Sequence, residues 1–269
     1  MKVYIRTFAR ISRLDPEPDI REFLTPMEAR RLSRMSRRAI WTCRTVLREA
    51  GLERPDAIIT GTGLGCIENT ESFLMSLTGV SDAPLRPTAF MQSTHNTVSS
   101  LLAIHTKCHG YNATYSHLGI SFESALRDAM IRLETGSARN VLVSAFEELT
   151  PTMARMLEKY GYAHQIDQDG KVSETAVSML LTTDPADALC VLEDVRMLRR
   201  KEDWGTAVSQ AGPATIMTRE DCAARYGGNL SVTALGVCDA AEGRRDALIV
   251  NDFYGKDFSL VKLSALCGN

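Results

Sequence analysis

Short apolar runs alternate with amphipathic helices along most of this 269-residue chain, and this alternation constrains the fold more than any other feature. The runs "DAIITG" (56–61) and "NVLVSAFEE" (140–148) are typical of buried strands, because apolar residues occupy successive positions in both. Strands that alternate with helices indicate a sheet that is covered by helices on both faces. The sequence therefore predicts an α/β fold.

The other elements are expected from periodicity and from residues that start or stop helices. Further strands are predicted at 2–8 (a first or edge strand), 112–117, 175–183 and 190–198, and a closing hairpin at 246–255 and 258–266. Helices are predicted at 26–51, 67–79, 94–107, 121–136, 151–161 and 229–243, with Pro26 in a first turn, Gly51 at a helix end and Thr94 as a cap. Residues 87–93 and 164–174 are expected to be loops, and 200–228 receive no assignment.

Two segments resemble each other. Residues 124–146 and 233–253 both run from a small residue and Ala-Leu, through a glycine, to a buried strand that ends in phenylalanine. Such an echo predicts an internally duplicated fold.

Composition excludes several classes. The formal net charge of −2 gives no basic field for nucleic acid. No run of 18 apolar residues exists, so no membrane span is expected, and the arginines of "MKVYIRTFARIS" argue against a signal sequence. The seven scattered cysteines form no CxxC pair, which predicts reduced thiols in the cytoplasm and no metal site.

Two patterns have a structural and a functional interpretation. "GTGLG" (61–65) partly matches a dinucleotide fingerprint, but Cys66 stands where the last glycine belongs, so a tight turn is the better interpretation. "RRLSRMSRR" (30–38) fits a solvated helix face, and the alternative is a docking patch for an acidic partner.

Several side chains are candidates for chemistry. Cys108 between His105 and His109 could form a nucleophile pair, but a packed thiol at a helix end is favoured. His95 could bond a turn or line a cavity, and both interpretations stay open. His117 is expected to be a satisfied, partly buried histidine.

The segment "NATYSHLGISFESAL" (112–126) raises the question of a nucleophile. It reads as a strand that turns into a helix, with His117, Gly119 and Ser121 at the junction. A helix N-terminus favours developing negative charge, so enzymes often place a nucleophile at such a turn.

Five segments together resemble the ketosynthases, the thiolase-fold condensing enzymes of fatty-acid and polyketide synthesis. They are residues 30–52, 56–73, 95–116, 121–150 and 246–263. The resemblance is good over residues 1 to about 150, fair over residues 246–265, and poor between them. The form "STHNT…SFESAL" is similar to ketosynthase-like proteins of aryl polyene and flexirubin-type pigment clusters, some of which resemble chain-length factors.

The resemblance implies one thiolase-like domain, layered α/β/α/β/α, over residues 1–269. It would comprise a ketosynthase N-terminal-like half (1–165) and a reduced C-terminal-like half (166–269). The family's catalytic cysteine falls at Gly119, and the chain has no histidine after His164, where the family has two catalytic histidines. The closing loop carries Tyr254 and Lys256 where the family has a glycine-rich run.

These departures favour a non-catalytic, chain-length-factor-like subunit. It would need no cofactor of its own, because the acyl chain would be carried on the phosphopantetheine of an acyl carrier protein. It would pair with a ketosynthase or with itself through the strand Asn112–His117. The expected substrate-binding residues are Gly119, Ile120, His117, His95 and Phe122.

Two alternatives remain. One is an active acyltransferase, hydrolase or 3-oxoacyl synthase that uses Ser121 or Ser116 with His117 or His95. Adjacent residues on a strand point to opposite faces, which argues against Ser116 with His117; Ser121 is otherwise expected to cap the helix. The other alternative is a dimeric scaffold with a filled interior beside Gly119.

Overall fold

The computed structural model describes residues 1–79, 87–161, 173–198, 201–210 and 214–266. Its strands are β1 (Val3–Ser12), β2 (Ala57–Gly61), β3 (Tyr111–Tyr115), β4 (Asn140–Glu147), β5 (Thr175–Thr182), β6 (Cys190–Leu198), β7 (Thr215–Thr218), β8 (Ala247–Phe253) and β9 (Asp257–Ala265). Its α-helices are α1 (Pro26–Ala29), α2 (Arg34–Glu49), α3 (Ile67–Leu77), α4 (Pro87–Met91), α5 (Thr97–Thr106), α6 (Ser121–Glu134), α7 (Pro151–Lys159), α8 (Lys201–Ser209), α9 (Arg219–Tyr226) and α10 (Thr233–Glu242). Two short 3₁₀ helices are η1 (Ile20–Glu22) and η2 (Leu118–Ile120).

The strands form one mixed sheet in the order β3-β2-β4-β5-β1-β6-β9-β8-β7. The pairs β2–β3, β2–β4 and β7–β8 are parallel, and the other neighbours are antiparallel. The α/β class predicted from the sequence is confirmed. The first strand is not at an edge, because β1 lies between β5 and β6.

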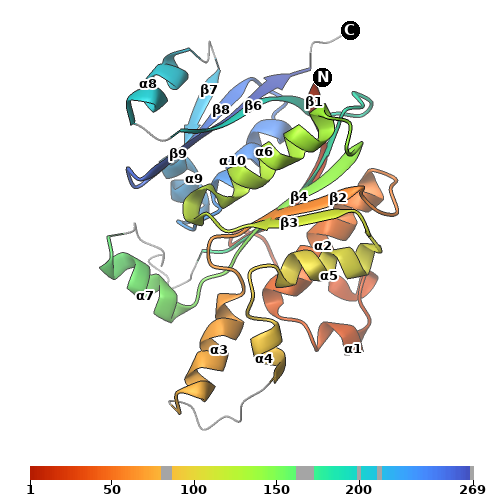
Figure 1. Cartoon of the computed structure of the whole chain (residues 1–269), viewed down its shortest axis with the longest axis vertical. Helices are drawn as coiled ribbons and strands as arrows, with labels where there is room; N and C mark the ends of the chain where they lie inside the picture. The colour runs from red at the N-terminus through yellow and green to blue at the C-terminus, as the bar shows by residue number, and fades with distance from the viewer. Residues whose placement is uncertain (80–86, 162–172, 199–200, 211–213, 267–269) are drawn as a thin grey trace.

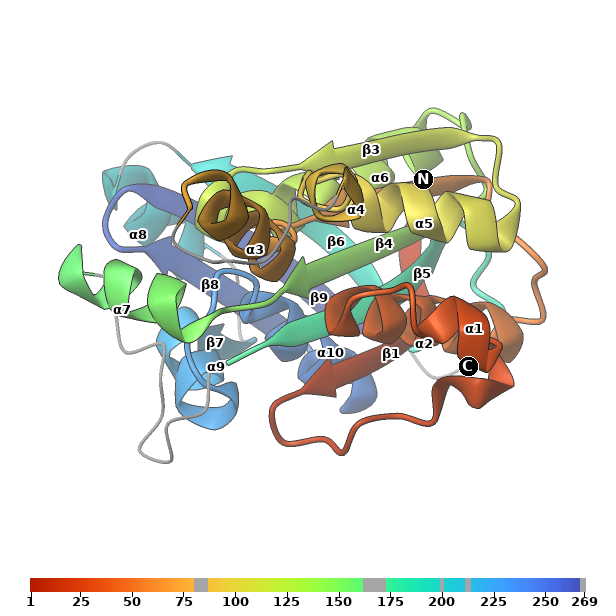
Figure 2. The same ribbon diagram turned by 90° about the horizontal axis from the view of Figure 1, so that it is seen from below.

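Helices cover both faces of this sheet (Figures 1 and 2). Val141 and Val143 of β4 point into a core that α6 and α10 share with both ends of the sheet. Leu142, between them, points to the opposite face, which α2 and α5 cover. At the far end of the sheet, α8 packs on the outer side of β8 and β9. Residues from both ends of this one sheet therefore pack against α6 and α10, which lie between them.

Most predicted elements are present, with local differences. The helix predicted at 26–51 is broken, because Ser33 accepts a bond from the Ser36 N–H and starts α2 as a new helix. Residues 87–91 form α4 instead of a loop. The cap of α5 is Asn96, not Thr94. The unassigned stretch contains α8, β7 and α9. The predicted loop 164–174, with His164, falls largely outside the described residues.

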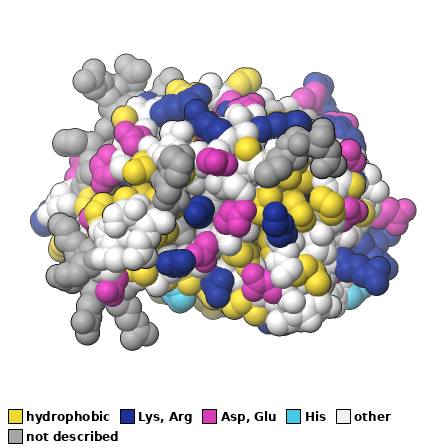
Figure 3. Space-filling model, turned by 90° about the horizontal axis from the view of Figure 1, so that it is seen from above, with side chains coloured by type: hydrophobic (Ala, Val, Ile, Leu, Met, Phe, Trp, Pro, Cys, Tyr) yellow, Lys and Arg dark blue, Asp and Glu magenta, His cyan; other side chains and the backbone are white. Residues whose placement is uncertain are grey.

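Two surface features agree with the compositional analysis. Within the described ranges, every helix is too short or too polar to cross a bilayer. On the face drawn in Figure 3, lysine and arginine side chains are interspersed with acidic ones, so no field of a single sign covers it.

Candidate functional site at the β3–α6 junction

The turn from β3 into α6 is closed by its own hydroxyl group. Ser121 Oγ accepts the His117 N–H at 2.8 Å and donates to the Leu118 carbonyl at 2.7 Å. Leu118 has φ +48°, a left-handed conformation that side chains rarely adopt. Ser121 is fully buried, and it is the first residue of α6 rather than its cap. Its hydroxyl is therefore committed to the backbone of the turn.

His117 contacts a serine that the sequence analysis did not consider. Its Nδ1 lies 3.0 Å from Ser124 Oγ, and that hydroxyl lies 2.9 Å from the Ile120 carbonyl. Because the hydroxyl proton goes to the carbonyl, the imidazole nitrogen is left to donate. His117 is exposed, and its ring stands edge-on to Tyr115. The prediction that His117 is partly buried is therefore wrong. Its ring contacts Ser124, so it does not activate Ser121.

Phe253 occupies the space in front of Gly119. Gly119 is buried, and an ideal Cβ there would overlap the Phe253 ring, lying 2.5 Å from Cε2. Phe253 ends β8, and Tyr254 after it has φ +53°. A side chain at position 119 would therefore require the Phe253 ring to move.

A buried carboxylate lies behind Gly119. Asn251 Nδ2 donates to the Gly119 carbonyl at 2.7 Å and to Glu123 Oε1 at 2.9 Å. Thr233 Oγ1 donates to the same Glu123 oxygen at 2.8 Å. Burial raises the pKa of Glu123, because a charged carboxylate is poorly solvated in the core. This group joins α6, α10 and β8.

Arg219 brings a buried positive charge to the same region. Its Nη2 donates to the Asn229 carbonyl at 2.6 Å, and its guanidinium lies 5.1 Å from the ring centroid of Phe253. Burial lowers the pKa of Arg219. Sequence reasoning missed Arg219, Asn251 and Phe253. The signal for Asn251 was a polar residue within the apolar run "ALIVNDF".

The glycine turn after β2 is filled by a side chain of β4. Glu147 accepts the N–H of Gly63 at 2.8 Å, the N–H of Leu64 at 2.9 Å and the Ser231 hydroxyl at 3.2 Å. Such a pair of N–H groups resembles an anion-binding nest, and here Glu147 occupies it. This contact agrees with the interpretation of "GTGLG" (61–65) as a tight structural turn rather than a nucleotide site.

The other sequence candidates are placed apart from this turn. His95 is exposed and lies over Gly65, whose ideal Cβ would be 3.1 Å from its ring. Cys108 is buried, and its Sγ bonds the Pro55 carbonyl at 3.3 Å, which fits a packed thiol. Phe122 is packed inside the central core, and Ile120 is half-buried. No cluster of metal-ligating side chains occurs in the part of the chain that the structure describes.

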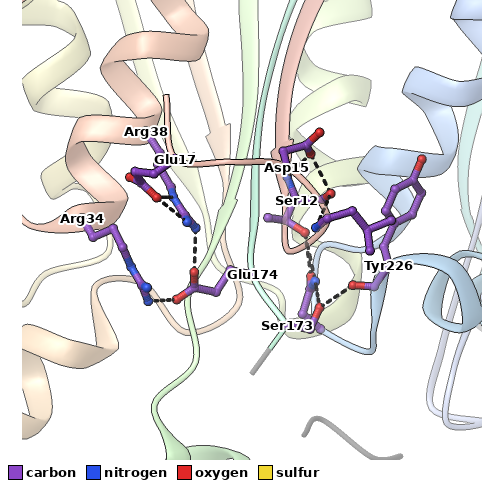
Figure 4. Close-up of polar contacts among 11 residues, drawn as sticks. Ser12, Asp15, Glu17, Arg34, Arg38, Ser173, Glu174 and Tyr226 are labelled. Carbon is purple, nitrogen blue, oxygen red and sulfur yellow. Dashed lines mark hydrogen bonds and ion pairs between the residues drawn. The ribbon is translucent and has the colours of Figure 1, made fainter. Parts of the chain in front are cut away.

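Two arginines of the basic run 30–38 form ion pairs within the chain (Figure 4). Arg38 bonds Glu174 at 2.6 Å and Glu17 at 2.6 Å, and Arg34 pairs with Glu174. A third, Arg37, bonds the carbonyls of Ala29 and Leu32. A nearby group in Figure 4 joins Ser12 to Asp15 and Ser173 to Tyr226. The basic run therefore holds α2 to neighbouring loops.

Comparisons with known proteins place this geometry in a structural context. The chain resembles one chain of a structure of a type II polyketide synthase acyl-carrier protein in complex with its ketosynthase bound to the hexaketide (TM-score 0.77, 13% identity, covering 98% of this chain and 99% of that chain). It also resembles one chain of the complex of a ketosynthase with its chain length factor from Xenorhabdus doucetiae (TM-score 0.63, 19% identity, covering 98% of this chain and 99% of that chain). A third similar structure is the ishigamide ketosynthase/chain length factor (TM-score 0.70, 18% identity, covering 94% of this chain and 86% of that chain). These likenesses show a ketosynthase-like thiolase fold.

Sequence comparison gives the family. A search of curated proteins found no match. The family model described as "Beta-ketoacyl synthase, N-terminal domain" matches residues 9–224, which is most of the chain. The chain therefore belongs to the beta-ketoacyl synthase family.

Proposed function

We propose that this chain is a non-catalytic, chain-length-factor-like subunit in fatty-acid or polyketide biosynthesis of the aryl polyene type. The observation that carries the proposal is the contact between Gly119 and Phe253. Gly119 stands where the resemblance puts the family's cysteine, and the ring fills the space that a nucleophile would need. The site therefore lacks both the attacking group and room for it.

The sequence supports the same conclusion. The family's two catalytic histidines belong to its second half, and this chain has no histidine after His164. General-base and oxyanion contributions are each worth about 10²–10⁴-fold in rate. Condensing activity by the usual route is therefore not expected.

The proposed partners are a ketosynthase, or a second copy of this chain, and an acyl carrier protein. Support comes from two structural relatives, one a ketosynthase in complex with its chain length factor and the other an acyl-carrier protein in complex with its ketosynthase. Acyl chains would then reach the pair on the carrier protein, and this chain would help to shape their cavity.

The outer edge of β3 is the proposed pairing surface. Among the described strands, β3 pairs only with β2. Because the Tyr115 carbonyl accepts the Thr62 N–H on the β2 side, the peptide groups of Asn112 and Thr114 face away from the sheet. An open edge offers its peptide groups to another strand. The helices α5 and α6 both contact β3, and each carries an exposed isoleucine, Ile104 (73% exposed) and Ile131 (43% exposed).

The proposed division into halves, 1–165 and 166–269, also has support. In the first half, α6 leads into β4, which has the parallel neighbour β2 on one side and the antiparallel neighbour β5 on the other. The unit α10–β8 has the same pattern around β8. These are the two segments whose sequences echo each other.

The first experiment is co-expression with the ketosynthase encoded nearby. We expect a stable complex, and we expect the product chain length to change when this chain is omitted. Ile131→Glu at the β3 edge should abolish the complex. Ile216→Glu, at an isoleucine that is 51% exposed on β7 at the opposite edge, should not. Unchanged products and no complex would refute the proposal; a complex with unchanged products would favour the scaffold alternative.

A second candidate function rests on the pair of His117 and Ser124. An acyltransferase or hydrolase with this pair would form an acyl-enzyme. Intact mass is measured after incubation with acyl- and malonyl-loaded carrier protein. No gain in mass is expected, because the Ser124 proton is bound to the Ile120 carbonyl. A gain that Ser124→Ala removes, and that Ser100→Ala at an exposed position of α5 leaves in place, would establish this alternative instead.

A further inference from the structure

The stretch 200–228, which received no assignment from the sequence, supplies a buried charge to the candidate site. Arg219 is the first residue of α9, and it follows directly after Thr218, the last residue of β7. Because β7 runs parallel to β8, Thr218 lies opposite Val250, and the chain continues beside the end of β8. Arg219 is 5% exposed. This part of the fold therefore places a guanidinium inside the molecule, next to the strand that carries Phe253.

The guanidinium of Arg219 lies against two consecutive aromatic rings. Its central carbon is 5.1 Å from the ring centroid of Phe253 and 5.9 Å from that of Tyr254. The two rings stand edge to face, with their centroids 5.0 Å apart. The guanidinium also hydrogen-bonds the Tyr254 side chain, and its Nη2 donates to the Asn229 carbonyl at 2.6 Å. Arg219 therefore connects the loop before α10 to the β8–β9 hairpin while it contacts Phe253.

Burial strengthens the hold of this guanidinium on the hairpin. The attraction between a cation and an aromatic ring is larger where water is excluded. A buried arginine also needs hydrogen-bond acceptors, so the guanidinium is not free to leave them. Tyr254 has φ +53°, in the left-handed region that side chains rarely adopt, and such a conformation persists only where its surroundings hold it. Arg219 supplies a contact of this kind, at the residue that follows Phe253.

We propose that Arg219 is a positioning residue that keeps the Phe253 ring against Gly119. The ring occupies the place of a side chain at position 119, since an ideal Cβ there lies 2.5 Å from Cε2. Arg219 acts on the site through this ring. The inference deepens the proposed function and rests on it, because a closed site is what the proposed non-catalytic role requires.

The competing explanation is that the sheet alone positions Phe253. Phe253 pairs with Asp257 in the β8–β9 hairpin, and its carbonyl accepts the Lys256 N–H at 3.1 Å. These contacts fix the backbone, but they do not select the rotamer of the side chain. The two explanations differ in what happens to the ring when Arg219 is replaced.

The Cα protons of Gly119 report the position of the ring. One of them takes the direction of a Cβ and therefore points at the Phe253 ring, whose ring current displaces its chemical shift. NMR of the chain with carbon-13-labelled glycine measures this shift. Phe253→Leu should abolish the displacement, and Arg219→Met should abolish most of it.

Arg225→Met is the matched control. Arg225 is also on α9, its side chain is 60% exposed, and it pairs with Asp239 and lies 5.1 Å from the ring centroid of Tyr226. This substitution should leave the Gly119 shift in place. Circular dichroism checks that each variant folds.

The outcomes separate this inference from the proposed function. An unchanged Gly119 shift in Arg219→Met, with a changed one in Phe253→Leu, would overturn the role of Arg219 and leave the closed site intact. An unchanged shift in Phe253→Leu would remove the contact on which the proposed function itself depends. If Arg219→Met does not fold, Arg219→Lys takes its place, because it keeps the charge but not the planar group that stacks and bonds on two sides. It should also change the shift, and an unchanged shift would overturn the inference.

Unfolding in urea gives an independent test. Gly119→Ala should raise the unfolding equilibrium constant of the wild-type chain by about 5–100-fold, because the methyl group overlaps the ring. The factor should be smaller in an Arg219→Met background, where the ring can turn aside, and unchanged in an Arg225→Met background. Equal factors in wild type and in Arg219→Met would contradict the inference.

Discussion

At the residue scale, the proposed non-catalytic role depends on the contact between Gly119 and Phe253. The two residues come from η2 and β8, and no space for a Cβ remains between them. Packed interiors respond to a single added methyl group, because neighbouring side chains already occupy their preferred rotamers. The absence of space beside Gly119 therefore depends on both Gly119 and Phe253, and substitutions of both residues can test it.

Gly119→Ala should lower the free energy of unfolding by about 1–3 kcal/mol, because the methyl group overlaps the Phe253 ring. Urea denaturation measures it. The cost of Gly119→Ala should shrink in a Phe253→Ala background, which a double-mutant cycle detects. Gly205→Ala on α8 is the control, since nothing lies within 4 Å of its ideal Cβ. Additive effects of the two substitutions would contradict the contact.

At the element scale, side chains at the ends of α2 and β4 connect these elements to neighbouring loops. Arg38 and Glu174 form a pair with side chains 10% and 8% exposed, whereas Arg48 and Glu22, on the last turn of α2 and on η1, are about half exposed. Removing one member of a buried pair leaves the other charge without compensation, while an exposed pair is screened by solvent. The same helix therefore carries a strong pair and a weak one.

Arg38→Ala should destabilise the chain by about 2–4 kcal/mol, and Arg48→Ala by less than about 1 kcal/mol. Thermal unfolding of both variants, compared with wild type, measures the difference. Equal shifts would show that burial of the Arg38–Glu174 pair does not determine its contribution.

Two adjacent carboxylates at the end of β4 hold the loop before α3 and the start of that helix. Glu147 bonds the glycine turn, and Glu148 accepts the Glu68 N–H at 3.2 Å. Burial raises the pKa of Glu147 and of Glu148 to about 7. Because these pKa values exceed the ordinary value of 4.5, the folded state binds more protons than the unfolded state between about pH 4.5 and 7. The contribution of each group to stability is therefore full at low pH and falls as pH rises through 7.

Glu148→Gln removes one of these titrating groups. Relative to wild type, its free energy of unfolding should rise by about 1–3 kcal/mol between pH 4.5 and 7.5, and stay level above that. Urea denaturation across this range measures the difference. Glu134→Gln, an exposed position on α6, is the control and should show no such trend. A constant difference for Glu148→Gln would contradict the assignment.

At the scale of the whole molecule, the sheet ends in β3 on one side and β7 on the other. The β3 edge is open, and the helices α5 and α6 that contact β3 carry exposed isoleucines, so we expect the chain to associate there even without a ketosynthase. Sedimentation at increasing concentration should show self-association in wild type and in Ile216→Glu, but not in Ile131→Glu. Loss of association in Ile216→Glu alone would move the interface to β7.

The sequence by itself determined the class of the fold and most of its elements. Apolar runs and helical periodicity report which face of each element is buried, and this information is local. It failed at 26–51 and 87–93, where a cap at Ser33 and a short helix depend on single turns, and at 200–228, where the pattern is too weak. The resemblance also placed Gly119 at the position of the missing cysteine.

Only the tertiary structure decided what surrounds Gly119. Phe253, Asn251 and Arg219 lie at least 100 residues away in sequence, and no local pattern indicates that they meet. The partner of His117 is close in sequence, but only the path of the turn between β3 and α6 decided that its exposed ring bonds Ser124 rather than Ser121. Neighbours within an element follow from its periodicity, but contacts between elements follow from how layers pack. The resemblance in the sequence therefore placed Gly119 at the family's cysteine position, and packing placed the Phe253 ring against that glycine.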